Sequence, residues 1–193
     1  MGSEPAKARR APRADSLRNR ERLLSAAREV FAEGGAEASL EAVARRAELG
    51  IGTLYRHFPT RESLFQAVYR KEVDELVDLA AALGAEADPT EGLRRWLGAN
   101  VRVIATKRGM LVALAPAPDS SKALYDDSRR RLVEAVGGLM RRAQVAGVMR
   151  ADVAPEEVLQ ALYGIAYGRE DAGWQDVALR LIDIFVDGLR LRT

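Results

Sequence analysis

The chain has 193 residues, of which 48% are apolar and 30% are charged, and its formal net charge is +2. This length suits one domain, or a small domain joined to a larger one, with a sizeable core. With no cysteine and one histidine, a disulfide framework and a cysteine or histidine metal cluster are excluded, so we expect no metal and no cofactor. No apolar run reaches the roughly 18 residues of a membrane span, and the charged N-terminus does not resemble a secretory signal. We therefore expect a cytoplasmic protein without a membrane partner.

Positive charge is concentrated towards the N-terminus. Residues 1–61 contain 12 Lys and Arg against 8 Asp and Glu, whereas the remainder contains 18 against 20. A basic end on a slightly acidic body suits the binding of a polyanion through that end. Residues 1–15, which mix Ala, Pro, Arg and Lys without periodicity, are predicted to form a disordered basic arm. A solvated tail without a ligand is the alternative.

Apolar residues recur with the helical period along the rest of the chain, and no useful length alternates with period two. The predicted fold class is therefore all-α, with about nine helices and no internal repeat. The expected helical segments are residues 16–33, 40–47, 51–58, 60–83, a helix starting at Pro89, a short apolar segment at 110–115, and residues 119–146, 155–167 and 174–191.

Capping and breaking residues mark several of these ends. Gly34-Gly35 ends the first helix, because glycine readily takes the left-handed cap conformation. Ser39 is a natural N-cap for the second helix. Asp88-Pro89-Thr90-Glu91 is a strong start signal, since a capping residue is followed by proline and then by a carboxylate. Pro116-Ala117-Pro118 ends the apolar segment before it.

Residues 39–65, SLEAVARRAELGIGTLYRHFPTRESLF, contain two short apolar segments separated by a few residues that include Gly50. This is the layout of a helix-turn-helix, in which the second helix enters the DNA major groove. We therefore expect a DNA-binding head at residues 16–62. Residues 63–193 form the remaining helical body.

The run Gly52-Thr53-Leu54-Tyr55-Arg56-His57-Phe58-Pro59, followed by Arg61-Glu62-Ser63-Leu64-Phe65, resembles the DNA-binding signature of the tetracycline-repressor (TetR) family of transcriptional regulators. The resemblance implies a helix-turn-helix head and a body that forms a ligand cavity and a dimer interface. It also implies that Thr53, Tyr55 and His57 contact DNA.

The remaining DNA contacts are predicted from the helix projection and from electrostatics. At about 100° per residue, Leu54 and Phe58 face the head while Arg56 points away, and Tyr55 packs its ring near the buried edge with its hydroxyl at a phosphate. A phosphate beside Arg61 would offset the cost of a cation in the first turn of a helix; a solvent-facing Arg61 is the alternative. The candidate DNA-binding residues are Ser39, Ile51, Gly52, Thr53, Tyr55, Arg56, His57 and Arg61.

Two residues of the turn depart from the family pattern. Glu48 stands where glycine is usual, and Gly50 stands where a small hydroxyl residue is common. We expect Gly50 to take over the unusual backbone angle. A Glu48 carboxylate near DNA would be repelled by phosphate unless it faces away. Ser39 either caps its helix or touches phosphate, and capping is favoured.

The body offers candidates for an effector site. Polar and aromatic side chains fall on its apolar stripes, and the resemblance implies that such helices surround one cavity. The alternative for each is a core residue bonded to backbone. The candidate ligand-binding residues are Tyr69, Trp96, Asn100, Tyr125, Ser128 and Tyr163, which suit a largely apolar, uncharged small molecule.

The last two expected helices are apolar over most of their circumference, so each requires a second partner. The resemblance implies a four-helix bundle between two subunits. The candidate dimer-interface residues are Leu159, Leu162, Ala166, Leu181, Phe185 and Leu189. Twofold symmetry would place the two recognition helices about 34–36 Å apart on a palindromic operator.

These features predict a homodimeric DNA-binding regulator, a repressor released from its double-stranded DNA operator by a small-molecule effector. An effector-independent or architectural DNA-binding protein is the alternative, and it predicts a body with no cavity. An enzyme has little support, because the chain shows no carboxylate pair, nucleophile–base set or phosphate loop at sensible spacing.

Overall fold

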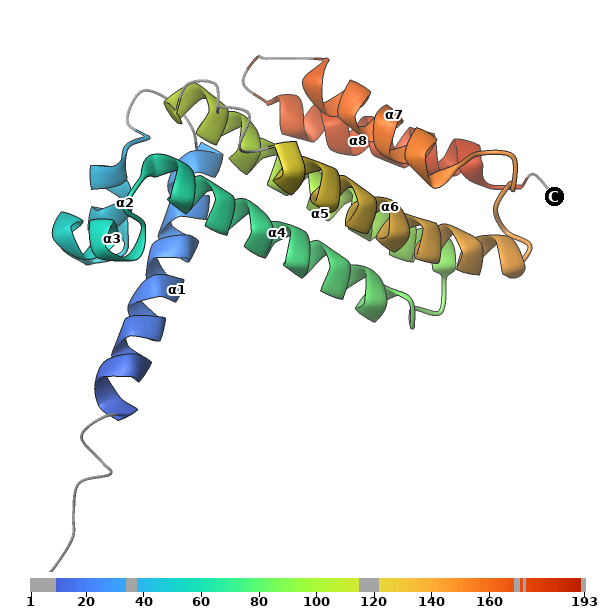
Figure 1. Ribbon diagram of the computed structural model, residues 1–193. Coiled ribbons are helices and arrows are strands. Elements are labelled where there is room, and N and C mark those ends of the chain that lie inside the picture. Colours follow the sequence, from blue (N-terminus) through green and yellow to red (C-terminus); the bar gives the residue numbers. More distant parts are fainter. Residues whose placement is uncertain (1–9, 34–37, 115–121, 169–170, 172, 192–193) are drawn as a thin grey trace, which may run out of the picture. The chain divides into compact units, whose positions relative to one another are not determined.

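The computed structural model describes residues 10–33, 38–114, 122–168, 171 and 173–191. Within these ranges the chain forms helices and no strand (Figure 1). The helices are α1 (Arg10–Glu33), α2 (Leu40–Arg46), α3 (Ile51–His57), α4 (Arg61–Leu83), α5 (Pro89–Leu114), α6 (Lys122–Val145), α7 (Pro155–Tyr167) and α8 (Trp174–Leu189). The predicted all-α fold is confirmed.

Two helix boundaries differ from the expected ones by more than a few residues. Helix α1 begins at Arg10 rather than near residue 16, which is possible because proline, here Pro12, is tolerated in the first turn of a helix. The apolar segment from Met110 continues α5, so the described residues form eight helices instead of nine. Residues 1–9 of the expected arm, Gly34-Gly35 and Pro116-Ala117-Pro118 lie outside the described residues.

Gly109 lies inside α5, at a position of close packing. A Cβ atom at this position would lie 1.8 Å from the carbonyl oxygen of Phe31. The backbone of α5 therefore passes directly against the last turns of α1, and only glycine allows that approach.

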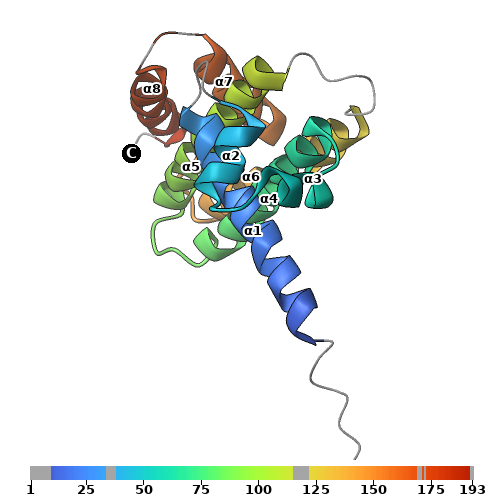
Figure 2. The ribbon, with the colours of Figure 1, turned by 90° about the vertical axis from the view of Figure 1, so that its left-hand side faces the viewer.

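The chain divides into two compact units, one of Met1–Val68 with Thr106–Ala117 and one of Tyr69–Ala105 with Pro118–Thr193. In the first unit α1 packs on α2 and α2 on α3. Leu23, Phe31, Val43 and Leu54 are buried at its centre. The first turns of α1 extend beyond α2 and α3 (Figures 1 and 2), and Leu17 is 66% exposed there.

In the second unit α6 packs on α7 and α7 on α8. Trp96 of α5 lies in its core, fully buried, and its indole nitrogen donates to the carbonyl oxygen of Leu76 on α4 at 2.8 Å. A short antiparallel bridge joins the chain after α6 to the chain after α8, with the amide of Arg150 donating to Leu189 and that of Leu191 to Val148.

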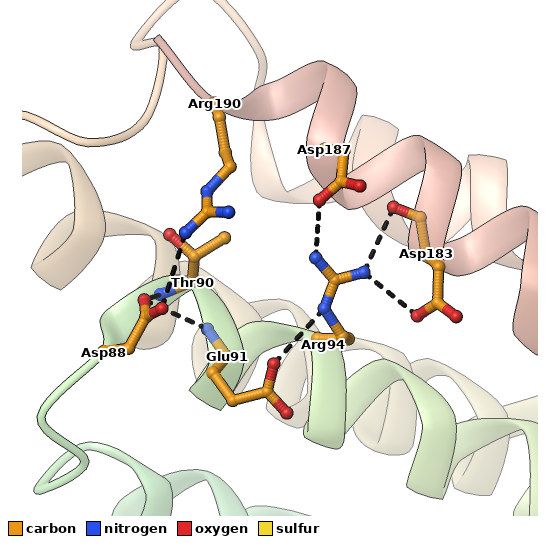
Figure 3. A network of polar contacts seen from close by, with 7 residues as sticks. All are labelled: Asp88, Thr90, Glu91, Arg94, Asp183, Asp187 and Arg190. Carbon is orange, nitrogen blue, oxygen red and sulfur yellow. Dashed lines mark hydrogen bonds and ion pairs between the residues drawn. The ribbon is translucent and has the colours of Figure 1, made fainter.

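A polar network joins the start of α5 to α8 (Figure 3). The guanidinium of Arg94 binds the carboxylates of Asp187 at 2.6 Å, Asp183 at 3.0 Å and Glu91 at 3.3 Å. Asp88 caps α5 by accepting from the Thr90 amide, and this hydrogen bond is the main reason that the pKa of Asp88 is lowered. Arg94 therefore links the start of α5 to the acidic side of α8 and helps to orient that helix about its own axis.

Nowhere in the described part of the chain does a helix combine the length and the apolar character needed to cross a membrane.

Replacing Trp96 tests its structural role. Trp96→Ala removes a fully buried indole and should lower the free energy of unfolding by about 3–5 kcal/mol, measured by chemical denaturation. Trp96→Phe should cost less, since it keeps an aromatic ring while losing the hydrogen bond to Leu76. Val145→Ala, at an exposed apolar residue of α6, is the control and should change the stability by under about 0.5 kcal/mol. An equally small effect of Trp96→Ala would contradict the core assignment.

Candidate nucleic-acid interface

Helix α2 is held in place by its cap and by its buried face. The hydroxyl of Ser39 accepts from the amide of Ala42 at 3.1 Å, so Ser39 caps the helix as favoured above. Leu40, Val43 and Ala44 are buried against the rest of the unit. The opposite side of α2 stays open to solvent, with Glu41, Arg45 and Arg46 exposed.

The turn after α2 corrects the expectation for Gly50. Glu48 takes the left-handed conformation with φ of 52°, whereas Gly50 has φ of −70° and ψ of 146°, which any residue can adopt. The reason is the end of α2. The amides of Glu48 and Leu49 return to the carbonyls of Arg45 and Ala44, and this hydrogen-bond pattern requires the left-handed residue at position 48.

The side chain of Glu48 points into solvent and is 85% exposed. Its carboxylate binds the guanidinium of Arg22 on α1 at 2.8 Å. Arg22 was counted above with the positive charge of the N-terminal end, but here a carboxylate from the turn neutralises it. Nothing in the sequence pattern relates residue 22 to residue 48, so only the folded chain shows this pair.

The recognition helix α3 is anchored by two residues of its buried side. Leu54 is fully buried and Phe58 is 2% exposed. The guanidinium of Arg20 on α1 lies 5.3 Å from the centre of the Phe58 ring, a cation–π contact that joins the end of α3 to α1. Tyr55 is 45% exposed, so the expectation that its ring packs at the buried edge is wrong. Its ring and its hydroxyl are both accessible to a partner.

The other candidate DNA-binding residues gather on the outer side of α3 and at the start of α4. Ile51, Gly52, Arg56 and Arg61 are exposed, and Thr53 and His57 are half-buried. Arg56 folds back over its own helix, donating to Thr53 Oγ1 at 2.9 Å and to the carbonyl of Gly52 at 3.3 Å. Gly52, Thr53 and Arg56 lie opposite Leu54 and Phe58, whereas the exposed Ile51 lies next to the buried side.

In the second unit the structure brings four candidate ligand-binding residues together. The rings of Tyr69 on α4 and Tyr125 on α6 meet edge to face at 5.5 Å, and Ser128 forms a hydrogen bond with the Tyr69 phenol. Burial raises the pKa of Tyr69, Tyr125 and Tyr163, and the neighbouring Tyr163 and Tyr125 phenols raise that of Tyr69 further. These phenols are neutral at physiological pH.

Trp96 and Asn100 do not share one role. The buried indole of Trp96 bonds to the backbone, so for this residue the core alternative is the better interpretation. Asn100 is also buried, but its Nδ2 has no hydrogen-bond partner among the described residues. An unpaired buried amide is costly, which keeps Asn100 a candidate for binding a ligand. Among the described residues, no group of three His, Cys, Asp or Glu could hold a metal ion.

Two stretches of the chain match known families of transcriptional regulators. Residues 23–68 match the family described as bacterial regulatory proteins, tetR family, and residues 88–191 match the C-terminal domain of SbtR-like transcriptional regulators. A TetR transcriptional regulator of known crystal structure from Streptomyces coelicolor is 41% identical, with a TM-score of 0.78 over 90% of this chain and 99% of that chain. The chain belongs to the TetR family.

Two further relatives are similar over most of their length. The TetR transcription regulatory protein from Mycobacterium vanbaalenii is 34% identical, with a TM-score of 0.72 over 93% of this chain and 99% of that chain. The HTH-type transcriptional regulator UidR of Escherichia coli is 29% identical over 89% of each chain. The predicted family is confirmed, and this TetR-family protein is a DNA-binding regulator of transcription rather than an enzyme.

The last two helices of this TetR-family chain each have a core side and an outer side. Four of the candidate dimer-interface residues, Leu159, Leu162, Ala166 and Leu189, are buried within the chain itself, so their side chains belong to its core. Phe185 is half-buried and Leu181 is 41% exposed. A second apolar strip, Val177, Leu181 and Ile184, continues through Gly188 along the outer side of α8, and Ile184 is 68% exposed.

Glu48 provides a test of the turn. Glu48→Gly removes both the left-handed strain and the carboxylate, whereas Glu48→Ala removes the carboxylate alone. We expect the glycine variant to be more stable than the alanine variant by about 1 kcal/mol in thermal unfolding. Both should bind a random-sequence DNA duplex more tightly, because each frees Arg22 and removes a negative charge.

Fluorescence anisotropy at fixed salt measures that DNA affinity. Equal stability of the two Glu48 variants would show that no strain resides at residue 48. Weaker DNA binding by both would show that Glu48 supports the interface through its bond to Arg22.

Proposed function

We propose that this protein is a cytoplasmic repressor that binds a palindromic operator as a homodimer and is released by an uncharged small-molecule effector. The observation that carries the proposal is the outer side of α3, where Gly52, Tyr55 and Arg56 are exposed while Leu54 and Phe58 hold the helix from its buried side. The membership of the TetR family, some of whose members are named repressors, supports the direction of regulation.

The DNA contacts follow from the position of each side chain around α3 and α4. Tyr55, His57 and Arg61 lie where phosphates of the groove walls would be met, and Ser39 sits at the capped end of α2. Gly52, Thr53 and Arg56 lie between these flanks and would face the base edges, whereas Ile51, in the first turn near the buried side, would meet DNA at the edge of the interface. Each phosphate contact releases counterions, so affinity should fall steeply with salt.

The effector would bind among Tyr69, Tyr125, Ser128 and Tyr163, with Asn100 as a further polar group. Neutral phenols and an amide offer hydrogen bonds without charge, which favours a largely apolar, uncharged molecule. Helix α4 runs without a break from Arg61 to beyond Tyr69, so the helix that follows the recognition helix also carries a ligand-binding residue. The effector would act by binding the DNA-free arrangement more tightly than the DNA-bound one.

The dimer would form through the outer strip of α8. Val177, Leu181, Ile184 and Gly188 recur at i, i+4, i+7 and i+11, so they follow one side of the helix. Arg94 binds Asp183 and Asp187 on another side, which leaves the apolar strip exposed. Two copies of this strip, related by a twofold axis, would cover each other.

Matched leucine substitutions on α8 test this interface. Leu181 and Leu179 are 41% and 39% exposed, but only Leu181 lies on the outer strip. Leu181→Glu would bury an unpaired charge between subunits, so it should yield monomers by analytical ultracentrifugation. Leu179→Glu should leave the dimer intact, because Leu179 lies instead beside Gly98 of α5. The interface would lie elsewhere if Leu181→Glu stayed dimeric.

A neutral apolar dye tests the effector site independently of the natural ligand. Nile red should bind with blue-shifted emission, and excess dye should weaken DNA binding. Tyr125→Ala, which removes the ring against Tyr69, should weaken dye binding and leave DNA affinity nearly unchanged. Tyr55→Ala should do the reverse, since Tyr55 lies on the recognition helix. Dye binding that never affects DNA affinity would favour an effector-independent DNA-binding protein.

A further inference from the structure

The side of α3 opposite its buried residues is centred on Arg56. Leu54 and Phe58 define the inward direction, and Arg56 projects about 180° from their mean. Gly52 and Thr53 flank it directly. When a helix lies in the major groove, the middle of its outward surface faces the base edges. The two flanks of that surface face the phosphate groups on either side of the groove. Arg56 would therefore face the base edges rather than the phosphate groups.

Glycine at positions 50 and 52 leaves this surface open. A Cβ atom added at either position would meet nothing within 4 Å, and Gly50 has an ordinary φ of −70°. The fold therefore requires glycine at neither position, although glycine inside a helix costs about 1 kcal/mol. The bare backbone beside Arg56 allows a partner to approach closely.

The guanidinium of Arg56 is held by one of its edges. Nε donates to the carbonyl of Gly52 and Nη2 to the hydroxyl of Thr53, so the Nε–Nη2 edge faces its own helix. Within the described part of the chain, Arg56 has no carboxylate partner, unlike Arg22 and Arg46. The outer edge formed by Nη1 and Nη2 stays available and offers two parallel N–H donors.

An edge that presents only donors selects among the bases. In the major groove guanine presents two acceptors, N7 and O6, side by side, whereas adenine pairs an acceptor with a donor and cytosine presents a donor. Resting on the DNA-binding function proposed above, we infer that Arg56, positioned by Thr53, reads a guanine in each half of the operator. Thr53 accepts the hydrogen bond from Arg56, so it acts here as a positioning residue.

The experiment begins with selection of binding sites from random-sequence duplexes by the full-length protein. The wild type should select a palindrome with one required guanine in each half-site. Replacing that guanine by 7-deazaguanine removes the N7 acceptor and should weaken wild-type binding between about 5-fold and about 100-fold. The same replacement should have little effect on Arg56→Ala, whose discrimination at that position is already lost.

Arg45→Ala is the matched control, because Arg45 is an exposed arginine of α2 without a carboxylate partner in the described residues. It removes the same charge but should retain the full penalty for 7-deazaguanine. If Arg56→Ala selected the same guanines and only lowered the salt dependence, Arg56 would be a phosphate contact and the inference would be overturned. A wild type that selects no palindrome would refute the operator itself, and base reading with it.

Discussion

The burial of two side chains supports everything that α3 presents on its outer side. Helices shorter than about 12 residues have little stability of their own in water, and α3 has 7. Leu54 and Phe58 therefore supply the packing that keeps it helical, and the Arg20 contact with Phe58 supports its end. The turn at Glu48 sets the direction in which α3 leaves α2. The exposed position of Arg56, Tyr55 and Gly52 is a consequence of these inward contacts.

Much of this head could be predicted because its determinants are local. The apolar spacing of α2 and α3, the Ser39 cap and the buried Leu54 and Phe58 can all be recognised within a few residues. The sequence-based predictions were wrong where a contacting residue lies far away in the sequence. They were also wrong where the local hydrogen-bond pattern outweighs the conformational preference of a residue type. Glycine at position 50 suggested the left-handed angle, but the hydrogen bonds that close α2 place it at Glu48. The end expected near residue 109 of the helix starting at Pro89 is absent, and Gly109 instead contacts Phe31, a residue of α1 that no local pattern relates to it.

The body was harder to predict for a related reason. Helical periodicity identifies apolar sides, but it does not distinguish the core of a chain from a surface between chains. Leu159, Leu162, Ala166 and Leu189 satisfied the pattern and are core residues, whereas Leu181 satisfied it equally and is exposed. Trp96 and Asn100 lie on the same apolar stripe of α5. The indole of Trp96 donates a hydrogen bond to the carbonyl of Leu76, whereas Nδ2 of Asn100 has no hydrogen-bond partner among the described residues. That difference depends on neighbouring helices.

The outer strip of α8 has a consequence for how the regulator responds to its own abundance. If subunits associate only through this strip, the population able to span both half-sites rises with the square of the subunit concentration when monomers dominate. Promoter occupancy would then change more steeply with expression level than for a protein binding as a single chain. The Arg94 contacts with Asp183 and Asp187, which orient the strip, would thereby influence the expression threshold for repression although they lie outside the DNA-binding head.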